Sequence, residues 1–430
     1  MARKMKDSGI EWIGEIPEGW EIKYFVQLFS QVKNKNIGLR EKNLLSLSYG
    51  KIKQKSIETV GGLLPDNFEG YNIIDRNDIV LRLTDLQNDQ HSLRVGLSPE
   101  RGIITSAYCS IRVRGAESPN YLYYYLHTFD IAKGFYGMGS GVRQGLSWDG
   151  LKYIKILLPP QHEQDRISVF LNQKTLEIDS ILSKTISSIE EYKKLKQTVI
   201  TQAVTKGVRG EREMKDSGVE WIGEIPVDWT IQRFARVAEV KSNLVSPDNY
   251  LEYPQISPEN IEKDSGKLLL PCKTVGEVGI ISGNHLFYKG QILYSKIRPK
   301  LNKVCIAPFD GLCSADMYPI ETNNDTRYIM YCILSNGFLQ QVSMITENRV
   351  KMPKVNQVEL SKILVAIPET IAEQTEIADY LDAKCAEIDG LIAKKDQLVK
   401  ELESYKKSLI YEVVTGKRDC LLYTSDAADE

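Results

Sequence analysis

The chain has 430 residues, of which 42% are hydrophobic and 26% charged, and this composition is typical of a globular protein with a substantial core. Its 55 Lys and Arg residues face 57 Asp and Glu residues, so a globally basic nucleic-acid binder is excluded, but a locally basic one is not. The seven cysteines are never spaced as CxxC and the four histidines stand apart, so the sequence indicates neither a disulfide framework nor a zinc site. Because it has no apolar signal core and no long uncharged apolar stretch, we expect a soluble, cytoplasmic protein that does not enter a membrane.

The first motif along the chain returns in its second half. MKDSGIEWIGEIPEGW, residues 5–20, recurs as MKDSGVEWIGEIPVDW, residues 214–229, with 13 of 16 positions identical. A later segment also repeats, because EQDRISVFLNQKTLEID, 163–179, corresponds to EQTEIADYLDAKCAEID, 373–389. The chain is therefore a tandem duplication whose two units agree at their ends. Their middle blocks differ, which indicates that the two units recognise different things.

Each variable block predicts a mixed α/β domain with a bias towards short strands. Strand-like runs separated by Gly, Asn, Asp or Pro lie at 44–49, 71–75, 78–83 and 108–114, and in the second block at 291–297, 302–307 and 317–321. An aromatic segment in each block, 120–129 and 327–335, predicts a short helix ahead of the closing strand ILLPP or VAIPE.

Each unit then ends in a segment that predicts a long helix. From Ile377 to Leu409 the apolar or long-stemmed residues, Lys384 and Lys395 among them, alternate at spacings of four and three, which is a heptad seam. The matching segment from Ile167 follows the same pattern less strictly. Because a lone helix would leave such a stripe exposed, we expect the two helices to pair with each other. Gly207 is expected to end the first of them.

Local charge and loop composition identify candidate DNA contacts. The block 17–158 holds 18 Lys and Arg against 14 Asp and Glu, and the block 226–367 holds 16 against 14. Arg and Lys can bind guanine edges or phosphates, and Asn and Gln can bind adenine edges. For each basic segment the alternative is an ordinary polar loop. The candidates are Arg143 and Arg349, which precede the closing strand of each block, followed by Arg82, Arg298, Lys296, Tyr49 and Gln144.

The sequence lacks the motifs of a self-sufficient enzyme. The glycine cluster at 137–141 has no acidic residue at the spacing of a nucleotide-binding fold, and the phosphate-binding pattern GxxxxGK[ST] is absent. The Asn-Pro-Pro-aromatic loop of amino-methyltransferases is absent as well. We therefore expect a binding protein with no catalytic, cofactor-binding or metal-binding residues of its own.

The repeated motifs resemble a known family. DSGxEWIGEIPxxW, the PPxxEQ start of a long helix, the ExxYKK segment and the VTKG ending together resemble the specificity subunit of type I restriction-modification enzymes. The resemblance implies two target-recognition domains, each reading one half of a bipartite site in double-stranded DNA. It also implies two long antiparallel helices that hold the domains apart and dock two modification (methyltransferase) subunits, with restriction (translocase and nuclease) subunits as further partners. S-adenosylmethionine and ATP with Mg²⁺ would then be bound by those partners, and this chain would be non-catalytic.

The expected fold is α+β, with two mixed α/β domains, two long coiled-coil helices and an internal duplication. The expected segments are domain 1 at 1–158, helix 1 at 159–207, linker and repeat start at 208–225, domain 2 at 226–367, helix 2 at 368–419 and an atypical tail at 420–430. The alternative function is a coiled-coil scaffold that binds no DNA and carries two variable protein- or glycan-binding modules. Salt-sensitive, sequence-dependent DNA binding would separate the two hypotheses.

Overall fold

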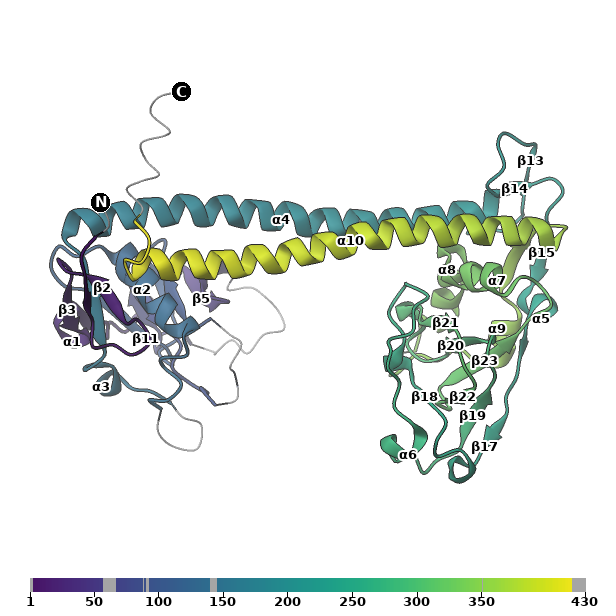
Figure 1. Ribbon diagram of the computed structural model, residues 1–430, viewed down its shortest axis with the longest axis horizontal. Helices are drawn as coiled ribbons and strands as arrows, with labels where there is room; N and C mark the ends of the chain where they lie inside the picture. Colours follow the sequence, from purple (N-terminus) through teal and green to yellow (C-terminus); the bar gives the residue numbers. More distant parts are fainter. Residues whose placement is uncertain are drawn as a thin grey trace. The chain divides into compact units, whose positions relative to one another are not determined.

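The computed structural model describes residues 3–56, 67–87, 89, 93–139, 145–349 and 351–419. The chain forms two compact units: unit 1 comprises Met1–Lys184 with Leu398–Glu430, and unit 2 comprises Thr185–Gln397. Two long helices, α4 (Gln161–Lys206) and α10 (Ile371–Val414), each contribute to both units (Figure 1). We call the mixed α/β part of each unit its variable domain.

The variable domain of unit 1 contains two four-stranded sheets. The first sheet has the order β4 (Phe29–Gln31), β11 (Cys109–Val113), β8 (Ile79–Leu81) and β9 (Val95–Leu97), with all pairs antiparallel. The second has the order β6 (Lys51–Lys55), β5 (Leu44–Ser48), β10 (Gly102–Ile104) and β7 (Asn72–Ile74), in which only the β5–β10 pair is parallel. Two-stranded pairs join β1 (Met5–Asp7) to β2 (Glu15–Pro17) and β3 (Glu21–Tyr24) to β12 (Lys155–Leu158). The helices are α1 (Phe25–Leu28), α2 (Pro119–Ile131) and α3 (Trp148–Leu151).

The variable domain of unit 2 also contains two four-stranded sheets and two two-stranded pairs. One sheet has the order β16 (Glu239–Val240), β23 (Met317–Glu321), β20 (Ile292–Ser295) and β21 (Val304–Ile306). The other has the order β17 (Leu244–Val245), β19 (Asn284–Phe287), β22 (Gly311–Cys313) and β18 (Gln255–Ile256). The pairs are β13 (Met214–Asp216) with β14 (Glu224–Pro226) and β15 (Thr230–Arg233) with β24 (Leu364–Ile367). The helices are α5 (Phe234–Val237), α6 (Val275–Val278), α7 (Thr326–Leu334), α8 (Asn336–Thr346) and α9 (Gln357–Ser361), with short 3-10 turns at Pro247–Asn249, Pro258–Asn260 and Pro299–Leu301.

The repeated DSG motif forms the turn between the first two strands of each repeat. In unit 1 the carboxylate of Asp7 accepts a hydrogen bond from the Gly9 amide at 2.9 Å, and the Ser8 hydroxyl accepts one from the Ile10 amide at 3.1 Å. Unit 2 repeats the first of these bonds between Asp216 and the Gly218 amide, also at 2.9 Å. Asp and Ser favour such turns because their short side chains can bond to nearby amides, so the identity of the two motifs reflects identical local geometry.

The two long helices pack against each other antiparallel within each unit. In unit 1, Ile167 near the start of α4 lies beside Val413 near the end of α10, and both belong to the domain core. In unit 2, Val204 near the end of α4 and Ile377 near the start of α10 belong to the same hydrophobic core. The expected pairing of the helices is therefore found within each unit. Helix α4 ends at Lys206, before Gly207 at φ +76°, as predicted for a glycine helix stop.

The predicted heptad seam is wrong at Lys384. That lysine is exposed, and the neighbouring Cys385 is buried in its place, as Thr175 is buried beside the less enclosed Lys174 in the first repeat. The reason is that these helices contact the variable domain as well as each other, so the buried face is wider than a two-helix seam. The predicted α+β class, the two domains, the long paired helices and the duplication are otherwise confirmed.

Candidate nucleic-acid interface

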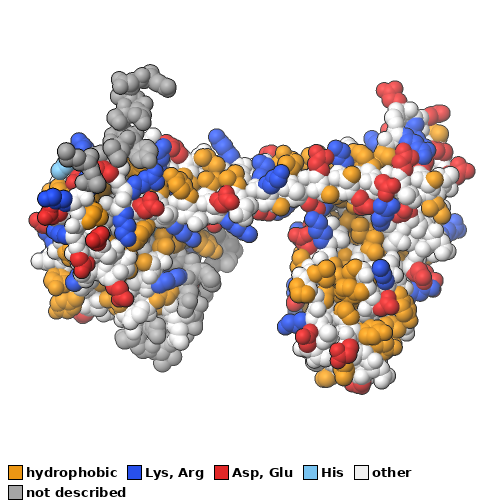
Figure 2. Space-filling view, in the orientation of Figure 1, with side chains coloured by type: hydrophobic (Ala, Val, Ile, Leu, Met, Phe, Trp, Pro, Cys, Tyr) orange, Lys and Arg blue, Asp and Glu red, His pale blue; other side chains and the backbone are white. Residues whose placement is uncertain are grey.

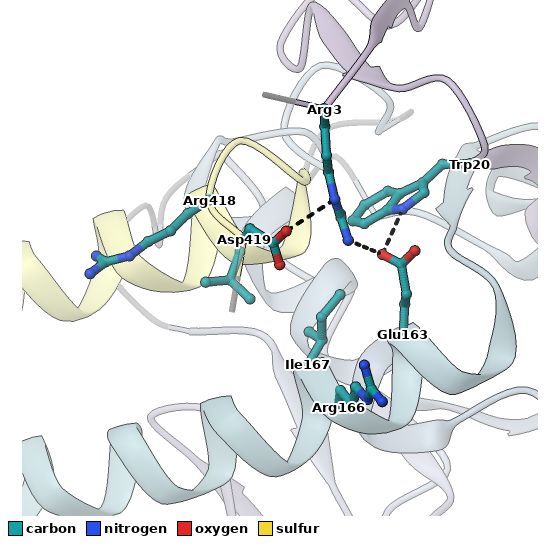
Figure 3. A pocket seen from close by; sticks show the side chains of 8 residues that line it. Arg3, Trp20, Glu163, Arg166, Ile167, Arg418 and Asp419 are labelled. Carbon is teal, nitrogen blue, oxygen red and sulfur yellow. Dashed lines mark hydrogen bonds and ion pairs between the residues drawn. The ribbon is translucent and has the colours of Figure 1, made fainter. Parts of the chain in front are cut away.

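The repeated opening motif is anchored by the glutamate in the first turn of each long helix. In unit 1 the Trp20 indole Nε1 donates to Glu163 Oε2 at 3.1 Å, and Arg3 Nη2 approaches the same oxygen at 3.1 Å (Figure 3). Arg3 Nε also lies 3.2 Å from Asp419 Oδ2. The cavity beside these side chains measures about 10 Å³, which is room for one water at most. This cluster is therefore a structural junction and not a ligand site.

Unit 2 repeats the junction with a more enclosed carboxylate. Trp229 Nε1 donates to Glu373 Oε1 at 3.2 Å, Arg212 Nη1 lies 2.5 Å from that oxygen, and Arg209 Nη1 lies 3.5 Å from Oε2. The Glu373 side chain is only 4% exposed. A buried indole N–H needs an acceptor, and both repeats supply one with the same Trp–Glu contact, across 143 positions in unit 1 and 144 in unit 2.

The glutamine after each glutamate holds the aromatic helix of the variable domain. Gln164 Oε1 accepts from the amide of Ser118, the N-cap of α2, at 2.9 Å. Gln374 Oε1 accepts from the amide of Asp325, the N-cap of α7, at 3.0 Å. The EQ pair therefore fastens both the opening motif and the aromatic helix to the first turn of a long helix.

A buried tyrosine in each variable domain contacts the last turn of a long helix, which is α10 in unit 1 and α4 in unit 2. The Tyr121 hydroxyl lies 2.9 Å from the Leu157 carbonyl and 3.3 Å from the Val414 carbonyl of α10. In unit 2 the Tyr328 hydroxyl lies 3.3 Å from the Val204 carbonyl of α4. Each variable domain is thus held by the beginning of one long helix and the end of the other.

An aspartate on α4 joins a loop of variable domain 1 to α10. Asp179 lies 2.8 Å from Lys51, at the end of the β5–β6 turn, and 2.5 Å from Lys406 on α10. Burial acts to raise the pKa of Asp179, but the hydrogen bonds from Lys406 and Lys51 outweigh it, so its pKa is lowered. The carboxylate therefore stays charged and fixes the position of the turn.

Three of the predicted DNA contacts lie at one edge of unit 2. The Arg298 amide donates to the Pro353 carbonyl at 2.8 Å, and the Val355 amide donates to the Lys296 carbonyl at 2.9 Å. Arg349 reaches the same place because its guanidinium donates to the Lys354 carbonyl. Two segments from different parts of the sequence, 296–302 on one side and 347–349 with 351–355 on the other, therefore form one basic edge. The sequence separates them by about fifty positions and does not predict this contact.

The side chains at this basic edge differ in their freedom to bind phosphate. Arg349 is paired with Glu359, which raises the pKa of the guanidinium, so it must exchange this partner to bind DNA. Lys296 Nζ lies 5.1 Å from the centre of the Tyr318 ring. Arg298 is exposed, adopts φ +45°, and makes no side-chain hydrogen bond or ion pair within the described residues. Arg298 is therefore the most accessible candidate cation of the three.

Unit 1 has a comparable junction between two segments. The Leu146 amide donates to the Leu83 carbonyl at 2.9 Å, which joins the segment after β8 to the segment before α3. Arg82 lies at this junction and pairs with Asp89 at 3.4 Å. Arg143 and Gln144 lie outside the described residues. Tyr49 is 80% exposed, but it belongs to the β5–β6 turn beside α4 and lines a groove of about 810 Å³ there, so it does not join the Arg82 edge.

Sequence reasoning missed the residue that organises the Arg82 loop. Arg94 is fully buried, and its guanidinium donates to the Arg82 carbonyl at 3.1 Å and the Thr84 carbonyl at 2.9 Å. It also donates to the carbonyls of Asp85 and Asp89. In the sequence, Arg94 is one arginine ahead of a short apolar run, and no local signal distinguishes it from a surface arginine.

The charge distribution does not single out one surface. On the face drawn in Figure 2, lysine and arginine side chains are interspersed with aspartate and glutamate on both units. Within the described residues no group of His, Cys, Asp and Glu side chains is arranged to hold a metal ion. No helix in the described part of the chain is both long and apolar enough to cross a membrane.

The comparisons with known proteins agree with the architecture. Residues 226–401 match the family described as the type I restriction modification DNA specificity domain. The chain is 33% identical over 279 residues to the type I restriction enzyme EcoDI specificity subunit of Escherichia coli, a match that covers 61% of this chain and 62% of that subunit. It is 24% identical over 431 residues to the putative type I restriction enzyme MjaX specificity subunit of Methanocaldococcus jannaschii, covering 94% of this chain and 95% of that one. A solved chain from a study of complex assembly and conformational transition in a type I R-M system has a TM-score of 0.67 at 14% identity, and the match covers 94% of this chain and 99% of that chain.

The fold and the matched domain define a duplicated, two-module protein whose modules are carried by paired helices. Residues 226–401 match the DNA specificity domain of type I restriction-modification systems, and the chain is similar to specificity subunits of such systems, the family that its repeated motifs resemble. The match to the EcoDI subunit spans less than two thirds of that protein's length.

Proposed function

We propose that the chain is the DNA-binding specificity subunit of a type I restriction-modification complex, with each variable domain reading one half of a bipartite site. The observation that carries this proposal is the match of residues 226–401 to a DNA specificity domain. The internal duplication extends it to unit 1, whose variable domain also has two four-stranded sheets. The scaffold alternative, with protein- or glycan-binding modules, has no comparable support.

The basic edges supply the contacts that such a function needs. In unit 2 the Lys296–Arg298 segment is braced by Pro353 and Val355, so its cations are presented from a fixed backbone. In unit 1 the buried Arg94 braces the Arg82 loop in a comparable way. Pre-organised cations bind phosphates or base edges with less loss of conformational entropy. We infer that these edges face the two half-sites.

The paired helices are suited to dock partner subunits. Helix α4 exposes several aliphatic side chains, among them Val169 at 67%, Leu176 at 69% and Ile186 at 50%. Exposed aliphatic groups of this kind along a helix favour a protein partner. We infer that two modification subunits bind here and supply S-adenosylmethionine and catalysis, that restriction subunits supply ATP-driven cleavage, and that this chain is a non-catalytic, cytoplasmic component.

The test is adenine-methylation mapping in cells that express the chain with its modification subunit. We expect methylation at one bipartite sequence, and we expect replacement of 17–158 by the block of a relative to change only one half of that sequence. No sequence-dependent methylation would contradict the proposed function. A change in both halves would contradict independent reading by the two domains.

A paired substitution tests the basic edge of unit 2. Arg298→Ala should weaken binding of the mapped duplex by about 1–3 kcal/mol if Arg298 reads a base, or lower the salt slope by about 1 if it binds phosphate. Arg349→Ala should have a smaller effect on affinity, because Arg349 already has Glu359 as a partner. The measurement is a titration of the mapped duplex at several salt concentrations. Unchanged binding by both variants would show that this edge does not contact DNA.

A further inference from the structure

A loop of variable domain 1, residues 36–41, is built as a rigid projection. Asn36 is fully buried, and its carboxamide bonds to both the amide and the carbonyl of Glu41, each at 3.0 Å. The Asn36 amide donates to the Tyr71 carbonyl at 3.0 Å, and the Leu39 amide donates to the Asn36 carbonyl at 2.9 Å. These bonds close the loop on itself and fasten its base to the neighbouring segment.

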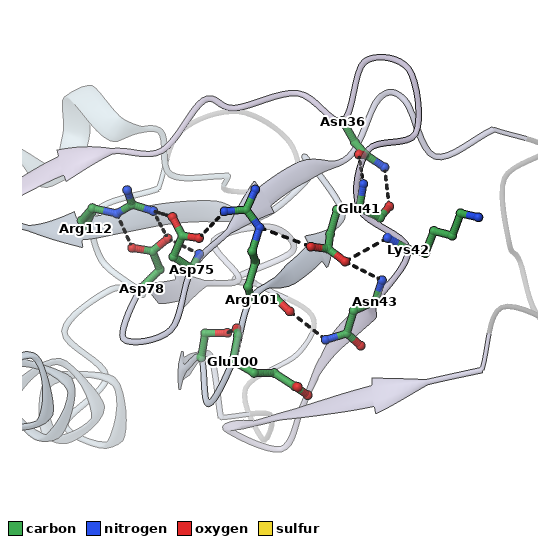
Figure 4. Close-up of polar contacts among 10 residues, drawn as sticks. Asn36, Glu41, Lys42, Asn43, Asp75, Asp78, Glu100, Arg101 and Arg112 are labelled. Atoms are coloured by element: carbon green, nitrogen blue, oxygen red, sulfur yellow. Dashed lines mark hydrogen bonds and ion pairs between the residues drawn. The ribbon is translucent and has the colours of Figure 1, made fainter.

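A chain of charged residues extends this support into the sheets (Figure 4). Glu41 accepts from Arg101 Nε at 3.2 Å, and Arg101 Nη1 donates to Asp75 at 3.0 Å. Arg112 then joins Asp75 at 2.6 Å to Asp78 at 2.7 Å. Asp78 is only 1% exposed, so the network ends in the domain interior. The loop is therefore held by the sheets and is not a freely moving segment.

The tip of this rigid loop presents two aliphatic side chains to solvent. Ile37 is 67% exposed and Leu39 is 47% exposed. Leu39 has φ +51°, a backbone conformation that side-chain-bearing residues seldom adopt. The Gly38 amide between them donates to Glu69 at 2.8 Å, which fixes the tip. A strained backbone that holds two aliphatic groups outward points to a binding role.

Cations surround this tip. Lys33, Lys35, Arg40 and Lys42 are all exposed within ten positions of the sequence, whereas the one acid among them, Glu41, is directed at Arg101. Lys35 Nζ donates to the Gly70 carbonyl, and Arg40 Nη2 donates to the Lys35 carbonyl, which shapes the basic rim. An apolar tip inside a basic rim is complementary to stacked bases between two phosphate backbones.

We propose that the loop 36–41 is a DNA wedge, in which Ile37 and Leu39 insert against a base step in the minor groove while Arg40 and Lys42 bind flanking phosphates. This inference rests on the proposed function and adds a way of reading DNA, namely how easily a particular step unstacks and bends. A protein partner is the less suitable occupant. Stable protein interfaces bury twenty or more residues per side, whereas this tip offers two aliphatic groups, with four exposed cations nearby and the Glu69 carboxylate engaged by the Gly38 amide.

The test uses the full chain with its modification subunit and the duplex identified by methylation mapping, with 2-aminopurine placed at successive positions. The wild-type complex should raise the 2-aminopurine fluorescence at one step away from the methylated adenines, which the modification subunits themselves turn out of the stack. Ile37→Ser with Leu39→Ser should abolish the signal and weaken binding about tenfold, with an unchanged salt slope. Arg40→Gln with Lys42→Gln should keep the signal at saturation and lower the salt slope by about 2.

The matched control is Ile281→Ser with Val358→Ser, which removes two exposed aliphatic side chains from variable domain 2 and should leave the signal unchanged. Thermal melting of each variant shows whether it is folded. Unchanged fluorescence and affinity in the Ile37 and Leu39 variant would overturn the wedge. A wild-type complex that binds the duplex and unstacks no base apart from the methylated adenines would overturn it as well. A wild-type complex that binds no specific duplex would instead remove the proposed function itself.

Discussion

The Lys196 ammonium lies 2.9 Å from both carboxylate oxygens of Asp389, and the lysine side chain is only 8% exposed. The same aspartate lies 2.6 Å from Lys267, which belongs to a loop of variable domain 2. Unit 2 therefore has the arrangement that Asp179 forms in unit 1, with one carboxylate joining a loop lysine to a lysine of the opposite helix. Because both repeats have it, the contact belongs to the shared framework that carries the variable loops.

The first prediction compares these two aspartates. Asp389→Ala should destabilise unit 2 by about 3–5 kcal/mol, because it leaves the ammonium of Lys196 buried without a counter-charge. Asp179→Ala should cost less, since Lys51 is 62% exposed and Lys406 23% exposed, and water can solvate both. Urea denaturation of the full chain measures the difference. If the two variants lost equal stability, burial of Lys196 would not determine the free-energy cost of removing its partner.

The pH dependence of this contact has a definite sign. Burial acts to raise the pKa of Asp389, but Lys267 and Lys196 lower it overall. The folded state therefore binds fewer protons than the unfolded state in acid, so the contribution of Asp389 to stability is present above the unfolded pKa and is lost as pH falls through the folded pKa. Asp389→Asn should remove this part of the acid sensitivity.

The second prediction concerns a histidine that occurs in one repeat only. His127 on α2 is 8% exposed, its Nδ1 has no hydrogen-bond partner in the described part of the chain, and burial followed by Lys406 and Lys407 lowers its pKa to about 4. Protonation therefore favours the unfolded state, and stability should fall as pH drops from about 6.5 towards 4, by about 1.4 kcal/mol per pH unit.

The second repeat has a buried leucine, Leu334, in the matching helix position, so His127→Leu should fit the site. We expect it to stabilise the chain below pH 6.5 and to remove this part of the pH dependence. The exposed His162 offers the control, His162→Leu, which should change neither quantity. Urea midpoints measured between pH 4.5 and 7.5 decide the matter, and an unchanged slope in His127→Leu would contradict the assignment.

Periodicity and repetition predict the framework because it is governed by local rules. The helix stop at Gly207 and the strand runs at 44–49 and 317–321 follow from turn chemistry and β propensity, and the structure has the helix end and both strands. The sequence pattern does not predict helix α8, at Asn336–Thr346. Its opening Ser335-Asn336-Gly337 is typical of a turn, but the Ser335 hydroxyl instead accepts the Phe338 amide as an N-cap.

The candidate site depends on contacts that the sequence does not encode locally. Arg349 is a reasonable candidate from composition, but only the fold shows that Glu359 already occupies its guanidinium. Ile37 and Leu39 resemble ordinary loop residues until the buried Asn36 and the network through Arg101 are known. Each of these relations joins residues through tertiary packing, which outweighs the local signal.

The third prediction concerns the buried arginine of variable domain 1. Arg94→Lys should destabilise unit 1 by about 2–4 kcal/mol, because a lysine cannot reproduce the planar fork that meets the Arg82 and Thr84 carbonyls. If the Arg82 loop reads DNA, the folded variant should also discriminate less between the cognate half-site and its single-base changes. Arg76→Lys, at an exposed position, is the control and should stay within about 0.5 kcal/mol of the wild type. If the melting curve of Arg94→Lys matched that of the wild type, the proposed bracing role of Arg94 would be wrong.

The last prediction compares the glycines that end the two long helices. Gly207 and Gly416 have φ +76° and +73°, so alanine is disfavoured at both by about 1–2 kcal/mol. The space around them differs. A Cβ at Gly416 would lie 2.5 Å from Pro17, a buried ring that cannot move aside, whereas at Gly207 it would lie 3.2 Å from the end of the Arg212 side chain, which needs to shift by only a few tenths of an ångström. Gly416→Ala should therefore cost a further 1–3 kcal/mol or so for the steric clash, and Gly207→Ala should not. Gly210→Ala, which meets no atom within 4 Å, is the control. Thermal melting ranks the three, and a larger loss for Gly207→Ala than for Gly416→Ala would show that the Pro17 contact does not limit this turn.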